Sequence, residues 1–237
     1  MSDLNRRRSV SQTHLVGLLG AELARWGTGH PGRDVVDLGG GTGGMAMSLA
    51  ADGYRVRVVD PSPDALAALE RRTAEERLAD RVAGVQGDAT DLIDLIGESS
   101  ADLVVCHKVL EVVEDPTQAL AAIARVLRPG GALSLLVAQR HASVLTQALA
   151  GHIAQARATW SDPARFDREQ IIGLVRRSGF ELVSTHGVGV VADHVAESVL
   201  DGEPGAHAEL LALESEVATD PAFQAVASYL HAFAVRP

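Results

Sequence analysis

One short stretch of the chain, VVDLGGGTGG at residues 35–44, combines an apolar run, a single carboxylate and five glycines. The apolar run predicts a buried strand that ends near Asp37, and the residues after Gly44 have a helical pattern. Glycines at such a junction let the backbone approach a ligand closely, and the free amides at the start of the helix favour polar or anionic groups. The stretch therefore predicts a ligand-binding loop.

Strand and helix patterns alternate along the chain around this loop. Seven apolar runs predict strands, at residues 34–38, 54–59, 81–85, 103–106, 132–138, 181–191 and 228–236. Helical patterns lie at residues 13–26, 44–51, 63–78, 117–127, 143–159, 167–177 and 197–220. The alternation predicts a doubly wound α/β fold with a mostly parallel seven-stranded sheet, helices on both faces, and helical insertions over the substrate side.

The length and composition favour a single domain. With 237 residues and 46% hydrophobic content, the chain can bury a substantial core. We expect an N-terminal helical segment at residues 1–32, a cofactor-binding core at 33–138, and substrate-side helices with the last strands at 139–237. The region 117–127 ends in Arg128-Pro129-Gly130-Gly131, which predicts that the helix stops there.

Charge and cysteine content exclude several classes of protein. The formal net charge of −10 disfavours general nucleic-acid binding, and Arg6-Arg7-Arg8 fits a solvated terminus better than an RNA-binding patch. The single cysteine, Cys106, gives no sign of an oxidising compartment. No signal peptide and no membrane-spanning apolar stretch is visible, so we expect a cytoplasmic protein without a membrane partner.

The glycine loop fits two kinds of nucleotide cofactor. Gly39, Gly41 and Gly44 satisfy the dinucleotide pattern G-x-G-x-x-G, and Asp60 lies where a ribose-binding acid would stand. An NAD-dependent oxidoreductase is therefore one hypothesis. Asp37 before the first glycine, and Asp88 at the end of the third predicted strand, favour S-adenosylmethionine instead. The chain also has no separate downstream domain for hydride chemistry.

Five segments together resemble class I S-adenosylmethionine-dependent methyltransferases. They are VVDLGGGTG at 35–43, VVDPS at 58–62, GDA at 87–89, CHKVLEVVEDP at 106–116 and VLRPGG at 126–131. The resemblance implies a Rossmann-like fold in which Asp60 binds the ribose and Asp88 with Ala89 lies beside the adenine. It also implies that the methionine part crosses Gly39 and Gly40 and approaches His107. The full set of cofactor residues that we expect is Asp37, Gly39, Gly40, Gly41, Asp60, Asp88, Ala89 and His107.

The chain is also similar to the bacterial methyltransferases that esterify the carboxylate of a carboxymethoxyuridine in tRNA. The similarity includes HKVLE at 107–111, GALSL at 131–135, His141, LALE at 211–214 and YLH at 229–231. The resemblance implies a substrate-binding arginine in the segment that matches residues 187–190. This chain has Gly189 there, and without that cation it lacks a partner for the carboxylate.

Histidines are the candidates for a catalytic role toward the methyl acceptor, and no metal-binding motif is visible in the sequence. A carboxylate acceptor needs no base, whereas a phenol or an amine profits from one, and the candidates are His107, His141 and His194. For His107 we favour a cofactor contact over a role as a base. The histidines are scattered without metal-ligand spacing, so we expect no metal. The hypotheses for function are a tRNA methyltransferase, a small-molecule O- or N-methyltransferase, the oxidoreductase, and a non-catalytic module that binds S-adenosylmethionine.

Overall fold

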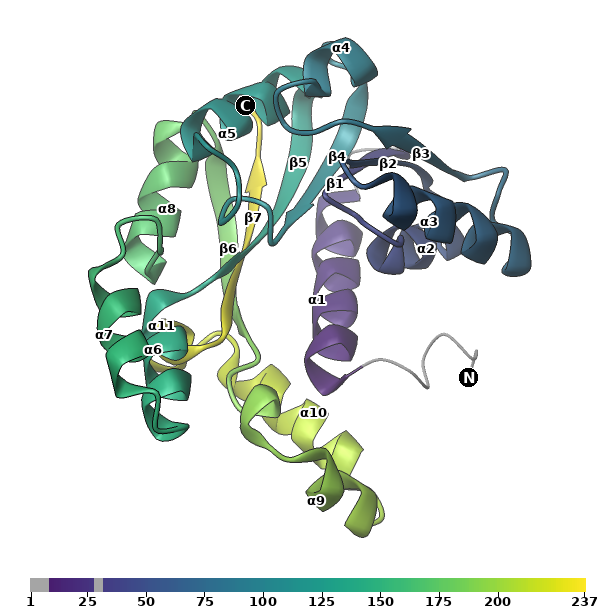
Figure 1. The fold of residues 1–237 in the computed structure, drawn as a ribbon. Helices are drawn as coiled ribbons and strands as arrows, with labels where there is room; N and C mark the ends of the chain where they lie inside the picture. The colour runs from purple at the N-terminus through teal and green to yellow at the C-terminus, as the bar shows by residue number, and fades with distance from the viewer. Residues whose placement is uncertain (1–8, 28–31) are drawn as a thin grey trace. The chain divides into compact units, whose positions relative to one another are not determined.

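The computed structural model describes residues 9–27 and 32–237, so Arg6-Arg7-Arg8 lies outside the described residues (Figure 1). The chain forms two compact units, each made of separate segments. The first unit contains the described residues up to Arg25 together with Val137–Ile171 and Thr185–His231. The second unit contains Trp26–Leu136, Ile172–Ser184 and Ala232–Pro237. These units do not coincide with the three segments expected from the sequence, and the single-domain organisation stays a prediction.

The strands form one mixed, mostly parallel sheet, as the sequence predicted. Its order is β3-β2-β1-β4-β5-β7-β6. The strands are β1 (Asp34–Leu38), β2 (Arg55–Asp60), β3 (Val82–Gln86), β4 (Ala101–His107), β5 (Leu127–Ala138), β6 (Glu181–Val188) and β7 (Tyr229–Val235). In the second unit the apolar run Leu103–Cys106 of β4 is fully buried, which is why the sequence shows it as a continuous stretch, whereas β2 begins with exposed Arg55 and Arg57 alternating with buried valines.

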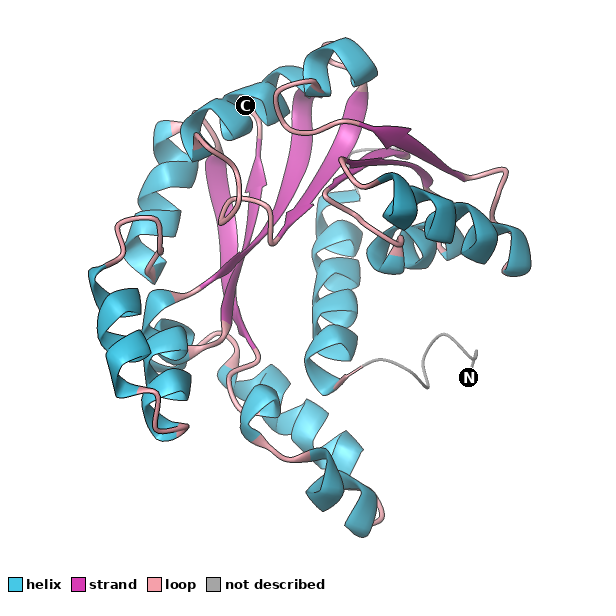
Figure 2. Cartoon of the chain, viewed as in Figure 1, coloured by secondary structure: helices cyan, strands magenta, loops and turns pink. Residues whose placement is uncertain are grey.

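Helices flank the strands, as the cyan and magenta elements of Figure 2 show. They are α1 (Val10–Trp26), α2 (Gly44–Ala51), α3 (Pro63–Glu75), α4 (Leu92–Ile96), α5 (Pro116–Val126), α6 (Arg140–Leu149), α7 (Ile153–Ser161), α8 (Arg168–Arg177), α9 (Glu197–Gly202), α10 (Ala206–Val217) and α11 (Pro221–Val226). Within the second unit, α2 and α3 pack against β2 and β3, and α4 packs against α5. Within the described ranges, no helix combines the length and apolar character needed to cross a bilayer.

The strand register gathers polar residues at one edge of the sheet. In β1, Asp37 is paired with Val58 of β2 and Val105 of β4, and all three strands are parallel. One strand further, Asp60 at the end of β2 is paired with Gln86 of β3. Because parallel strands end at the same edge, Asp37, Asp60, the segment after Gln86 and His107 at the end of β4 share the carboxyl edge, where open α/β sheets bind ligands.

Several element boundaries differ from the sequence prediction. The helix expected at 143–159 is two helices, because Gly151 with a φ of 82° ends the first of them. The acidic segment 197–220 also contains a break, at Gly205 with a φ of 92°. The strand expected to reach residue 191 ends at Val188, since Gly189 turns the chain with a φ of 69°. The sequence analysis missed the short helices α4 and α11.

The segment Arg128-Pro129-Gly130-Gly131 is strand rather than a turn. It belongs to β5, which begins at Leu127, one residue after α5 ends. The N–H of Gly130 donates to the carbonyl of Arg236, and the N–H of Arg236 donates to the carbonyl of Gly131, at 2.8 Å each. These two bonds pair backbone groups of a segment whose residues are typical of a helix end. The pairing of β5 with β4 shifts in register between Ala101 and Leu103 of β4.

Candidate functional site

The loop between β1 and α2 requires glycine at two positions for different reasons. Gly39 has a φ of 69°, and a Cβ there would lie 2.5 Å from Cγ2 of Val109. Gly40 has ordinary backbone angles, but a Cβ there would lie 2.5 Å from Oδ2 of Asp37. The loop therefore passes over the Asp37 carboxyl and beside the residues after β4 with no space for side chains, so only its backbone is presented at these positions.

Asp60 connects the end of β2 to the glycine loop. Its Oδ2 accepts a hydrogen bond of 2.8 Å from the N–H of Gly41, and its Oδ1 accepts one of 2.9 Å from the N–H of Ser62. The side chain is only 8% exposed. Each carboxylate oxygen can accept two hydrogen bonds, so both oxygens keep acceptor capacity for ligand hydroxyls. The sequence predicted the position of this acid, but not that it fixes the loop.

Asp37 is a buried carboxyl at the end of β1. It is 2% exposed, and its Oδ2 has no hydrogen-bond partner among the described residues. Burial raises the pKa of Asp37 to about 7; the N–H of Ala46 opposes this rise and the Asp60 carboxylate adds to it. A carboxyl in this state can take up or release a proton when a charged group binds beside it.

Asp88 and Ala89 follow β3, as predicted, but Asp88 is exposed while Ala89 is buried. Oδ1 of Asp88 accepts hydrogen bonds of 2.7 Å from both the N–H and the hydroxyl of Thr90. These bonds hold the pKa of Asp88 below its usual value. The N-cap of α4 is Asp91, so Asp88 closes a turn rather than capping that helix. Its ionised carboxylate lies at the sheet edge defined above.

His107 ends β4 and is held by a residue that sequence reasoning missed. Its Nε2 lies 2.8 Å from the hydroxyl of Ser134, which is fully buried in β5. Burial lowers the pKa of His107 to about 3, and the neighbouring Lys108 contributes to the decrease. A neutral imidazole that engages Ser134 is a poor proton acceptor, which agrees with the preference for a cofactor contact. The signal for Ser134 was present as the one polar residue in the apolar run of β5.

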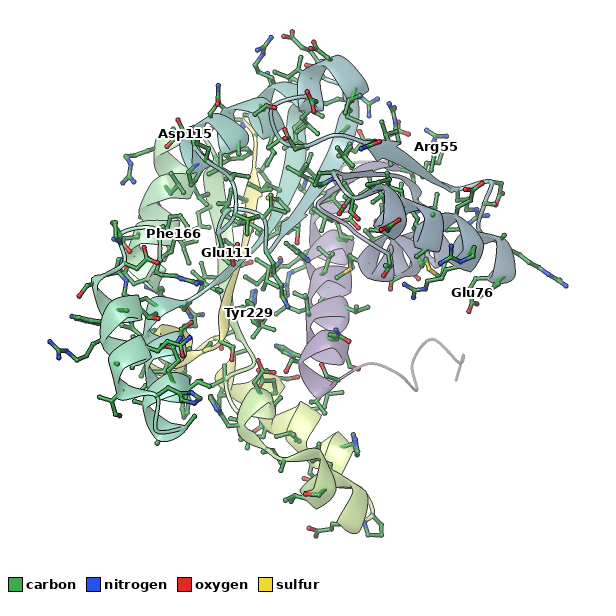
Figure 3. The ribbon with its side chains drawn as sticks, in the orientation of Figure 1. Arg55, Glu76, Glu111, Asp115, Phe166 and Tyr229 are labelled. Carbon is green, nitrogen blue, oxygen red and sulfur yellow. The ribbon has the colours of Figure 1, made fainter. Side chains whose placement is uncertain are left out.

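Glu111, which is labelled in Figure 3, comes from the segment after β4. With Asp37 it adds negative charge around Cys106, which is fully buried in β4. Burial first, and then these two carboxyls, raise the pKa of the Cys106 thiol far above its ordinary value. Cys106 is therefore a packing residue of the strand and not a nucleophile.

His141 and His194 lie in the first unit and are not brought together by any hydrogen bond among the described residues. His141 is the second residue of α6, where its Nδ1 lies 3.3 Å from the carbonyl of Ala225 and its ring centroid lies 5.9 Å from that of Trp160. His194 is exposed at the end of a single 3₁₀ turn, η3 (Ala192–His194). The two histidines therefore offer separate candidates rather than one catalytic pair.

Gly189, where the resemblance implied an arginine, has a backbone conformation that favours glycine. With its φ of 69°, a Cβ there would lie 2.2 Å from Oδ2 of Asp193 and 3.0 Å from Cβ of Ser228. The position is thus a tight turn in this chain. The backbone of residues 190–192, which follow it, is held by Glu214. The sequence analysis named Glu214 only as part of the segment LALE at 211–214.

Glu214 is fully buried in α10 and accepts three backbone hydrogen bonds. The N–H groups of Val190, Val191 and Ala192 donate to its two carboxylate oxygens at 2.8, 2.8 and 2.9 Å. Charge-assisted bonds of this kind are strong, so Glu214 fixes the segment after β6. Within the part of the chain that the structure describes, no group of three or more acidic, histidine or cysteine side chains is arranged to hold a metal ion.

Comparison with known proteins identifies the central region. Residues 36–135 match a methyltransferase domain family. The chain is 27% identical over 211 residues to the tRNA 5-carboxymethoxyuridine methyltransferase of Escherichia coli strain K12, covering 86% of this chain and 80% of that protein. It is 29% identical over 162 residues to the ubiquinone biosynthesis O-methyltransferase of Burkholderia thailandensis. That match covers 67% of this chain and 68% of that protein.

A solved structure supports the fold. The putative sarcosine dimethylglycine methyltransferase from Galdieria sulphuraria superposes with a TM-score of 0.65 at 17% identity, covering 93% of this chain and 84% of that one. It shares the Rossmann-like arrangement described above. The domain match, the sequence relatives and the fold make this chain a class I S-adenosylmethionine-dependent methyltransferase that resembles the tRNA 5-carboxymethoxyuridine methyltransferases.

Proposed function

We propose that the second unit binds S-adenosylmethionine through the residues at its carboxyl edge. Asp60 takes the ribose hydroxyls, Asp88 and Ala89 lie beside the adenine, and the methionine part crosses Gly39 and Gly40. The observation that carries this proposal is the pair of bonds from Gly41 and Ser62 to the Asp60 carboxylate. They pre-organise an acceptor of hydroxyl groups directly beside the glycine loop, which reduces the cost of ordering it when the cofactor binds.

Asp37 and His107 complete the proposed cofactor site. The buried Oδ2 of Asp37 has no partner among the described residues, and such an acceptor fits the ammonium group of the methionine part. Glycine at position 41 supplies the remaining backbone contact. When bound, the cofactor supplies an activated methyl group on a sulfonium, which transfers to an in-line nucleophile. His107 then contributes a fixed neutral contact rather than a base, because its pKa is low.

For the acceptor, we favour a small molecule with a neutral hydroxyl or amine. The glycine at position 189 supports this choice, because it offers no side-chain cation to bind a carboxylate, and its φ of 69° favours glycine there. The alternative is a tRNA uridine carboxylate, and the 27% identity over 86% of this chain favours it. The cytoplasmic location expected from the sequence belongs to the same proposal.

Transfer of a radiolabelled methyl group from S-adenosylmethionine to fractionated cell extract tests both parts. Label in the metabolite fraction is the expected result. Label only in small RNA, released by mild base as an ester would be, supports the tRNA carboxylate and contradicts the small-molecule acceptor. No label in any fraction, with S-adenosylhomocysteine bound, contradicts methyl transfer and favours a non-catalytic binding module.

A further inference from the structure

Lys108 is the only lysine in a chain whose other strongly basic residues are all arginine. It follows β4 directly, at the carboxyl edge of the second unit, where the residues of the proposed cofactor site also lie. Lys108 is exposed, whereas Val109 and Leu110 after it are buried. The residue therefore faces solvent from a segment that is otherwise packed into the protein.

The backbone of Lys108 is in the left-handed conformation, with a φ of 61°. Among the described residues, only Arg77 and Ser99 also combine a positive φ with a side chain. Arg77 follows the C-cap of α3, where a left-handed residue is common, and Ser99 lies in the turn between α4 and β4. Lys108 follows a strand, so no helix end accounts for its conformation. Glycine would adopt this conformation at lower cost, which indicates that the lysine side chain has a role there.

Contacts on both sides hold Lys108 in place. Its own N–H donates to the carbonyl of Leu136 at 2.8 Å. On one side, His107 is held by its hydrogen bond to β5. On the other side, Val109 packs so closely that a Cβ on Gly39 would lie 2.5 Å from its Cγ2. The backbone of Lys108 is thus fixed beside the glycine loop, which reduces the cost of ordering the residue when a ligand binds.

The charges around Lys108 are mainly negative. The carboxyl edge carries the carboxylates of Asp60 and Asp88, and Glu111 follows in the same segment as Lys108 (Figure 3). The Lys108 ammonium contributes to the low pKa of His107, so its charge acts at the end of β4. An anion that reaches this edge is therefore attracted by Lys108 and repelled by the carboxylates around it.

Two anions come into question as partners of Lys108: the methionine carboxylate of the cofactor and an anionic group of the acceptor. Asp37 and Asp60 of the proposed cofactor site are buried, whereas Lys108 is exposed. Exposure favours the acceptor, which arrives from solvent. Methylation of an anionic oxygen removes its charge, so an ion pair with that oxygen would weaken in the transition state and slow the transfer. The anion at Lys108 is therefore a different group from the one that is methylated.

We propose that Lys108 binds an anionic group, a carboxylate or a phosphate, of the small-molecule acceptor and so orients the acceptor's separate hydroxyl or amine for methylation. This inference rests on the proposed function and deepens it, because it names the class of acceptor. Lysine suits this task, since its compact charge on a flexible stem reaches an anion without the fixed two-point geometry of arginine. The acceptor is thus an acidic metabolite with a second, nucleophilic group.

Transfer of a radiolabelled methyl group to fractionated extract tests the proposal through Lys108→Gln. Wild-type label should be retained on an anion exchanger, and phosphatase treatment before the column distinguishes a phosphate from a carboxylate. Lys108→Gln removes the charge but keeps a long side chain with the same backbone strain. We expect its rate in dilute extract to fall by about 10- to 100-fold, as for a lost hydrogen bond to a charged group, and to recover partly in concentrated extract.

Arg77→Gln is the matched control, because it removes one positive charge from an exposed residue that is also left-handed. It should label the extract as the wild-type chain does. Lys108→Arg restores the charge and should regain most of the activity. High salt should slow labelling by the wild-type chain and leave that by Lys108→Gln almost unchanged, because screening weakens an ion pair only where one forms.

Binding of S-adenosylhomocysteine, measured by calorimetry, separates the possible failures. Lys108→Gln should bind it as the wild-type chain does. An affinity lowered by about tenfold or more would assign Lys108 to the cofactor and overturn the inference. Label in neutral or cationic metabolites, or equal rates for Lys108→Gln and wild type, overturns the inference alone. Label only in small RNA, or in no fraction, contradicts the proposed function as well.

The single lysine also allows a test that needs no methyl transfer. With carbon-13 at the ε position of lysine, the wild-type chain gives one side-chain NMR signal, which belongs to Lys108. With S-adenosylhomocysteine bound, the anionic metabolite fraction of the extract should shift this signal, and the neutral fraction should not. A signal that does not respond to the anionic fraction would overturn the inference.

Discussion

Asp37→Asn should change how the stability of the chain depends on pH. The carboxyl is 2% exposed, and its pKa is raised from 3.8 to about 7. Between these two values the unfolded chain ionises Asp37 while the folded chain keeps it protonated. The folded state therefore binds more protons, and the free energy of unfolding falls as pH rises through this window. The decrease is complete only above the folded pKa.

The size of the effect follows from the same values. One pKa unit corresponds to about 1.36 kcal/mol. The difference of about 3 between the folded and unfolded pKa values of Asp37 therefore removes about 4 kcal/mol from the free energy of unfolding of the wild-type chain between pH ~4 and ~8. Asparagine cannot ionise, so the variant escapes this loss. It instead places an amide N–H₂ where Oδ2 lacks a partner, which costs about 1 to 3 kcal/mol at every pH.

Urea unfolding at a series of pH values measures this difference. The free energy of unfolding of Asp37→Asn minus that of the wild-type chain should rise by about 4 kcal/mol as pH increases across the window. Asp80→Asn, at a side chain that is 76% exposed, serves as the control and should leave the pH dependence unchanged. Parallel profiles for wild type and Asp37→Asn would refute the argument that burial keeps this carboxyl neutral.

Three further substitutions test the supporting structure. Glu214→Gln should lower the free energy of unfolding by about 3 kcal/mol, because it weakens charge-assisted bonds from three backbone amides to a buried carboxylate. Chemical denaturation measures this change, and a loss under about 1 kcal/mol would contradict the prediction. Gly189→Arg should destabilise the chain by roughly 1 to 3 kcal/mol, because the φ of 69° at this position is strained for a residue with a side chain, and it should confer no methylation of tRNA. A stable variant that gains tRNA labelling would be the opposite result. Lys108→Gly should raise the melting temperature, because Lys108 has a φ of 61° that costs about 1 kcal/mol in a residue with a side chain; an unchanged or lower value would count against strain there.

The sequence predicted the sheet well for a physical reason. The strands carry apolar stretches that mark them in the sequence, and the carboxylates Asp37 and Asp60 and the imidazole of His107 stand at or near their ends. Chain order alone then places these ends at one edge. The predicted end of the helix before Arg128-Pro129-Gly130-Gly131 is confirmed, but the strand expected from residue 132 begins at Leu127, because residues 130 and 131 pair with Arg236, over a hundred residues away.

The contacts of the first unit were harder to predict because they join distant segments. His186 meets Glu22 across more than 160 positions in sequence, and neither residue belongs to a recognisable motif. The candidates His141 and His194 were chosen because they follow strands, but they do not share a hydrogen bond within the described ranges. Ser134 stands out in the sequence as the one polar residue of its apolar run, but its partner follows only from the register of β4 and β5, which places it beside His107.

Calorimetric titration with S-adenosylhomocysteine tests the central claim most directly, with Asp60→Ala compared against Glu70→Ala at an exposed position of α3. Removing the carboxylate eliminates its hydrogen bonds to the ribose and releases Gly41, so affinity should fall by about 1.5 to 3 kcal/mol, or roughly tenfold to more than a hundredfold. Glu70→Ala should bind as the wild-type chain does. Unchanged affinity in Asp60→Ala would contradict the proposed cofactor site, and tight binding of NADH in place of S-adenosylhomocysteine would contradict the cofactor itself.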